Sequence, residues 1–69
     1  MMFVNLQNCA GFLRDAAPRL FPANRVITFG EYQAILYDYG ENIEILSQND
    51  PWTVAMPDDE AIAFLLRWS

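Results

Sequence analysis

The stretch from residue 25 to residue 47 constrains the fold of this chain most strongly, because its pattern is that of three β-strands joined by tight turns. Residues 26–29 form a β-branched and aromatic run, and Gly30-Glu31 fits a type II′ turn. The chain continues as a second strand over 32–38, turns again, and returns over 43–47 with the alternation of a half-buried strand. The sequence therefore predicts an antiparallel three-stranded meander.

Amphipathic segments flank this predicted sheet. Asn5 is a good N-cap, and apolar residues recur after it at helical spacing, which predicts a helix to about Ala17 because Pro18 lacks a backbone donor. Leu20 and Phe21 are expected to close the edge of the core. Residues 52–56 suit a fourth, short edge strand, an assignment that the sequence leaves open.

A closing helix is predicted after Pro57, because Asp58, Asp59 and Glu60 lie where the positive end of a helix dipole favours anions. The whole chain is then one α+β domain, residues 1–69, in the order α-β-β-β-(β)-α. It is an antiparallel meander packed with N- and C-terminal helices, and the sequence leaves open whether both helices cover the same face.

Composition narrows the class of protein. Apolar residues make up 54% of the chain, which is typical of a compact core. No apolar run approaches the roughly 18 residues of a membrane span, and the N-terminus lacks the pattern of a signal peptide. Cys9 is the only cysteine, so an internal disulfide is excluded. We expect a soluble cytoplasmic protein, in the cytoplasm of the bacterial host if the chain is phage-encoded.

The predicted pairing places an apolar row on the sheet face opposite the core. Val26, Ile35 and Leu46 lie side by side across the three strands in this register. A face exposed only to water would normally be polar, so something is expected to cover the row. That cover is either a helix or the segment around Trp52 within the same chain, or else a partner surface, including a second copy in a homodimer.

The charge balance points to a basic partner. Nine acids against four arginines give a net charge of −5, which disfavours direct binding to nucleic acid or to an acidic membrane. Acids and aromatic rings gather at the second predicted reversal, residues 39–42, and suit contact with a basic groove. We therefore expect partner contacts at Tyr37, Asp38, Tyr39, Glu41 and Glu44, together with Val26, Ile35 and Leu46.

The chain lacks several of the residue types that enzymes commonly use for catalysis. The chain has no histidine and no lysine, which removes the commonest general base and all Schiff-base mechanisms. The clustered acids Asp58, Asp59 and Glu60 are explained by the helix start and lack the spacing of a Ca²⁺ or Mg²⁺ site. We expect no enzyme activity, no cofactor and no metal. An enzyme of another type would need a pocket with a perturbed carboxylate.

In size, acidity and helix-flanked antiparallel sheet, the chain resembles the small phage-encoded inhibitors of bacterial defence of the anti-CRISPR type. The resemblance implies stoichiometric inhibition by docking on the nucleic-acid-binding surface of a larger protein. The leading hypothesis is therefore a binding module that acts as an inhibitor or adaptor on a basic surface. The alternative is a structural homo-oligomer that buries its apolar sheet face by self-association.

Overall fold

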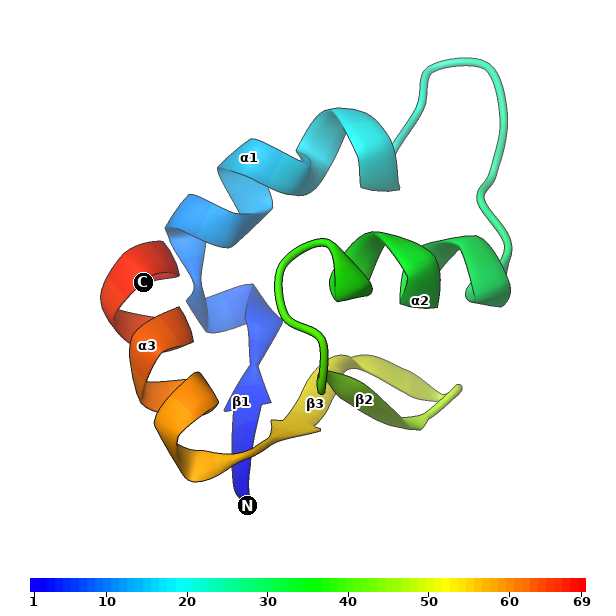
Figure 1. The fold of residues 1–69 in the computed structure, drawn as a ribbon. Coiled ribbons are helices and arrows are strands. Elements are labelled where there is room, and N and C mark those ends of the chain that lie inside the picture. The colour runs from blue at the N-terminus through cyan, green and yellow to red at the C-terminus, as the bar shows by residue number, and fades with distance from the viewer.

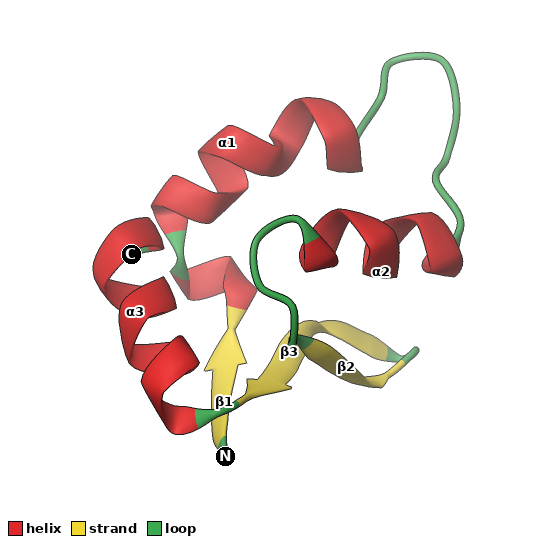
Figure 2. Cartoon of the chain, viewed as in Figure 1, coloured by secondary structure: helices red, strands yellow, loops and turns green.

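The structure is a computed structural model that describes all 69 residues. In chain order its elements are β1 (Met2–Asn5), the 3-10 helix η1 (Leu6–Asn8), α1 (Ala10–Leu20), α2 (Phe29–Tyr37), β2 (Glu44–Ser47), β3 (Asp50–Met56) and α3 (Asp58–Trp68). In Figure 1, α2 lies above the β2–β3 hairpin with α1 beyond it, and α3 packs beside α1 and β1. Figure 2 shows one long loop, residues 21–28, which joins α1 to α2 and is called the connector below. The predicted α+β class, with an antiparallel sheet packed against helices, is confirmed.

The sheet has the strand order β1-β3-β2, and both pairings are antiparallel. Val54 of β3 lies opposite Val4 of β1 and Ile45 of β2, so these three β-branched side chains share the face that meets the core. The strand predicted over 43–47 is confirmed as β2, and the segment over 52–56 is indeed a strand. It is the central strand rather than an edge, because the N-terminal strand β1, which was not predicted, pairs with its far side. The sheet is therefore not a simple meander.

The strands predicted over 26–29 and 32–38 are wrong, because most of this stretch forms α2. The Thr28 side chain accepts a hydrogen bond from the backbone N–H of Glu31, whose carboxylate accepts one from the N–H of Thr28. This capping box satisfies two donors at the start of a helix, where a type II′ turn would need a positive φ at Gly30. No glycine has a positive φ. Tyr32 and Ile35, one turn apart, then face the core.

An ion pair strengthens the same helix start. The Arg25 guanidinium lies 2.8 Å from the Glu31 carboxylate. Together with the hydrogen bond from Thr28, this lowers the pKa of the Glu31 carboxyl below its ordinary value. Arg25 and Thr28, in the second half of the connector, thus both contact Glu31 in the first turn of α2.

The N-terminal segment differs from its prediction at both ends. Asn5 does act as a cap, but for η1, whose Gln7 N–H it binds. The α-helix begins at Ala10 and continues through Pro18 to Leu20. Pro18 lies two residues before the end of α1, so the helix continues for less than one turn beyond the hydrogen bond that this proline cannot donate. The closing helix, α3, begins at Asp58 with three acids in its first turn, as predicted.

A single core of fourteen buried side chains joins all the elements. Leu20 belongs to it as predicted, but Phe21 is 63% exposed, so the prediction that both close the core is half wrong. Within the stretch predicted as a meander, Tyr32, Leu36 and Ile43 are buried, whereas Phe29 is 41% exposed. None of the three helices combines the length and the apolar character needed to cross a membrane.

Candidate functional site

The apolar row predicted across the sheet does not exist. Val26 lies in the connector and is 91% exposed, Leu46 lies on β2 and is about half exposed, and Ile35 is buried in the core face of α2. The row depended on a strand register, and residue 35 belongs to a helix instead. Of the three, only Val26 and Leu46 remain available to a partner.

The acidic and aromatic residues predicted at the second reversal are dispersed rather than gathered. Tyr37 is half exposed at the end of α2, and Glu41 and Glu44 are exposed and form no ion pair. Asp38 is paired with Arg19, and Tyr39 is half-buried. Only Asp38 and Tyr39 line a common hollow.

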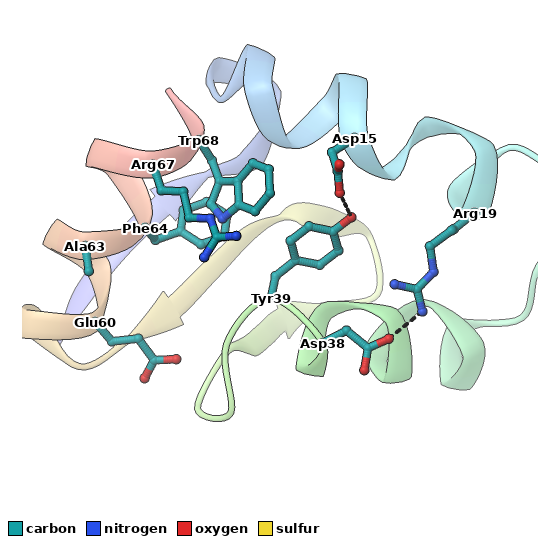
Figure 3. Close-up of a pocket in the computed structure, with 9 residues that line it drawn as sticks. All are labelled: Asp15, Arg19, Asp38, Tyr39, Glu60, Ala63, Phe64, Arg67 and Trp68. Carbon is teal, nitrogen blue, oxygen red and sulfur yellow. Dashed lines mark hydrogen bonds and ion pairs between the residues drawn. The ribbon is translucent and has the colours of Figure 1, made fainter.

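That hollow is a charged cleft of about 450 Å³ between α1, the α2–β2 loop and α3 (Figure 3). It is lined by Asp15, Arg19, Asp38, Tyr39, Glu60, Ala63, Phe64, Arg67 and Trp68. In Figure 3 the Tyr39 hydroxyl donates to Asp15, and the Arg19 guanidinium reaches Asp38. Glu60 accepts from the side-chain amide of Asn42 at 3.1 Å. Each carboxylate of the cleft therefore already has a donor from this chain.

The aromatic rings of the charged cleft have structural roles as well. Tyr39 meets Phe12 and Trp68 edge-on, with ring centroids 4.9 and 5.2 Å apart. Burial, together with the hydrogen bond to Asp15, raises the pKa of the Tyr39 hydroxyl. Arg67 lies over the Trp68 ring, 4.9 Å from its centroid. The charged side chains that line this cleft each interact with another side chain of the same protein.

A second hollow, of about 470 Å³, differs in character and is called the aromatic groove below. Its apolar wall is made by Phe21, Val26, Ile27, Phe29, Tyr32 and Trp52. These side chains come from the connector, the first turns of α2 and the β2–β3 hairpin, which converge at one end of the molecule. Arg25 is the only charged residue in the lining, and its guanidinium is paired with Glu31.

The base of the aromatic groove is rigidly built. Trp52 contacts Phe21 and Tyr32, with ring centroids 6.2 and 6.0 Å apart. The Tyr32 hydroxyl donates to the carbonyl oxygen of Pro51 at 2.7 Å. Burial, with a smaller contribution from the charge of Asp50, raises the pKa of Tyr32 to about 12. The phenol is thus a neutral donor that ties α2 to the hairpin.

Sequence reasoning missed Phe21 and Phe29 at the rim of the aromatic groove, and it placed Val26 on a sheet face instead. Phe21, Val26 and Phe29 are all exposed, although large apolar residues of this kind usually enter a core. One signal was present in the sequence, since Phe21, Val26 and Phe29 fall within nine positions of one another. The signal was not recognised because Val26 and Phe29 had been assigned to a strand and Phe21 to the edge of the core.

The arrangement offers contact surface rather than reactive groups. Cys9 is buried, and burial raises the pKa of its thiol, so the thiolate is disfavoured. No three histidine, cysteine or acidic side chains are placed to hold a metal ion together. No family of known proteins, no curated protein and no solved structure matches this chain.

Proposed function

We propose that this chain is a protein-binding module, a stoichiometric inhibitor or adaptor that docks on a basic surface of a larger protein through its aromatic groove. The observation that supports this proposal is the exposed apolar rim at Phe21, Val26 and Phe29 above a rigid base. Aromatic side chains in a preformed apolar pocket are typical of the few residues that dominate binding energy at interfaces.

The rest of the molecule supports a basic partner. The net charge is −5, and Glu41 and Glu44 are exposed without a cationic neighbour. Unpaired surface charges of one sign speed association with a surface of the opposite sign and fix its orientation. The apolar contact then supplies affinity, and the acids supply steering.

Capture of binding proteins with a charge-matched pair of variants tests the proposal. Val26→Asp places a carboxylate on the groove rim, whereas Leu66→Asp places the same charge on the exposed side of α3, where Leu66 is 81% exposed. Both side chains are largely exposed, so both variants should keep the circular dichroism spectrum of the wild type. We expect proteins held by the wild type and by Leu66→Asp to be lost from Val26→Asp, with affinity falling at least about tenfold.

Two further results complete the test. Replacing both Glu41 and Glu44 by lysine should lower the association rate constant at low salt. Added salt should reduce the difference in this rate constant between the variant and the wild type. Equal loss of binding in both aspartate variants would contradict the proposal, and so would equal retention. A dimer of the free protein that Val26→Asp dissociates would instead support self-association, the alternative function.

A further inference from the structure

The middle of the connector has few backbone hydrogen bonds within the chain. Apart from a turn at residues 23–24, residues 22–27 form no backbone–backbone hydrogen bond, and no side chain donates to or accepts from their N–H and C=O groups. The nearest pairs lie at its two ends, where Phe21 N–H bonds Ala17 and Thr28 takes part in the capping box. Free backbone groups of this kind are ready to pair with another chain.

The composition of this free segment is that of a strand. Val26, Ile27 and Thr28 are β-branched, which is why a strand was predicted here. Thr28 has the torsions of extended backbone, φ −79° and ψ 164°. The segment therefore has strand composition and unused hydrogen-bonding groups, and it lacks only a neighbouring strand.

The aromatic groove lies directly beside this segment. Val26 and Ile27 belong both to the free segment and to the groove wall, and Trp52 faces them from the hairpin. Successive side chains of an extended peptide point to opposite sides, so a peptide that runs along the connector would place every second side chain toward the groove. One surface thus offers backbone pairing and an apolar pocket together.

We infer that the partner contributes an extended peptide segment whose backbone pairs with residues 25–27 and whose apolar side chain fills the aromatic groove. This inference rests on the proposed function and adds the form of the contact, which is strand addition. It differs from docking of a helix or a flat surface, because neither could use the backbone groups of the connector.

Charge selects the kind of segment. Asp50 precedes the groove residue Pro51, and its carboxylate accepts only from the Trp52 N–H and the Thr53 hydroxyl, with no arginine in contact. A second copy of the chain would bring another net charge of −5 to this acidic molecule. The occupant is therefore a segment with an apolar anchor between arginine or lysine residues.

The test uses capped hexapeptides with a central Leu, Phe or Trp flanked by arginine and lysine, and a matched set flanked by aspartate and glutamate. Binding to the whole protein is followed by titration and by hydrogen exchange of its backbone amides. We expect the basic set to bind the wild type, to bind Val26→Asp more weakly, and to slow exchange at residues 25–27. The acidic set should bind at least about tenfold more weakly.

Methylation of peptide nitrogens tests the backbone pairing itself. Alternate N–H groups of a paired strand point toward its neighbour, so methyl groups on one alternate set should reduce affinity by about tenfold or more. Methyl groups on the other set serve as the matched control and should leave affinity nearly unchanged. Equal effects of the two sets, failure of the basic set to bind, or unchanged exchange at residues 25–27 would overturn the inference.

The inference and the proposed function fail in different ways. A captured protein that needs Val26 but leaves exchange at residues 25–27 unchanged would overturn strand addition and keep the aromatic groove as a docking site. A captured protein that binds Val26→Asp and the wild type equally would overturn both.

Discussion

Gly11 lies where α1 and α3 come closest to each other. A Cβ atom built on it would be 2.9 Å from the carbonyl oxygen of Trp68 and 3.3 Å from its Cα. Backbone atoms cannot turn aside as a flexible side chain can, so the two helices would have to separate. Gly30 in α2 is the opposite case, since its added Cβ would meet only the Thr28 hydroxyl at 3.9 Å.

This contrast predicts opposite signs for one substitution. Gly30→Ala should stabilise the protein by about 0.5 to 1 kcal/mol, because alanine has the higher helix propensity and restricts the unfolded chain. Gly11→Ala should destabilise it by about 1 to 3 kcal/mol, because the clash between helices outweighs the same gain. Urea unfolding of both variants measures the two changes. Stabilisation by Gly11→Ala would show that α1 and α3 are not in contact at this point.

At the scale of elements, the start of α2 decides between two local structures. The run from Thr28 to Tyr37 is rich in β-branched and aromatic residues, which favour a strand. The capping box and the burial of Tyr32, Ile35 and Leu36 favour a helix, and in the structure the helix forms. Capping and side-chain burial outweigh the strand propensity of these residues, which is why the prediction of the meander is wrong here.

Removal of the cap should therefore weaken α2 measurably. Thr28→Ala deletes the oxygen that accepts from the Glu31 N–H, and we expect the free energy of unfolding to fall by about 1 kcal/mol. Thr28→Ser keeps the oxygen and is the matched control, with little loss. Chemical denaturation followed by far-UV circular dichroism checks both. Equal loss in both variants would place the effect in the methyl group rather than in the cap.

Other elements show which signals in a sequence suffice. α3 was predicted from Pro57 and three acids because helix starts are encoded within a few residues, and β2 was predicted from its alternation. β1 was missed because four residues carry little local signal, and its strand character comes from pairing with the distant β3. For the candidate site, Val26 was predicted as a partner contact on a sheet face. It is exposed in the connector instead, and its contact with a partner stays a prediction. Trp52 was predicted as part of a short strand or as a cover for the apolar row, and its place in the groove was not predicted because it depends on tertiary structure.

At the scale of the whole molecule, Tyr32 joins the helical layer to the sheet. Its ring lies in the single core, and its hydroxyl donates to the Pro51 carbonyl at the start of β3. A chain of 69 residues buries a modest fraction of its surface, so one such link is a noticeable part of its stability.

The pKa of Tyr32 predicts how stability depends on alkaline pH. The folded value of about 12 lies above the ordinary value of 10.0, so the folded state holds this proton more tightly. Its contribution is complete below pH 10 and is lost as pH rises from 10 toward 12. Tyr32→Phe should lower the free energy of unfolding by about 1 kcal/mol at neutral pH.

Guanidinium unfolding of the wild type and Tyr32→Phe between pH 8 and pH 11.5 checks this prediction. The difference in the free energy of unfolding between the wild type and Tyr32→Phe should decrease across the upper part of that range, because only the wild type has this phenol to ionise. Tyr37→Phe, which removes the hydroxyl of a half-exposed tyrosine, is the control for the loss of a phenol as such. Parallel curves for the wild type and Tyr32→Phe would contradict a raised pKa.

The pairing of β1 with β3 has a consequence for how the chain is made. A ribosome releases β1 first, yet the strand that must lie beside it is released only after α1, α2 and β2. Until then Val4 and the edges of β1 have no partner in the nascent chain, and the sheet has no centre. The sheet can therefore form only after β3 has been released, and termination before β3 would leave a fragment with exposed apolar side chains for chaperones and proteases to bind.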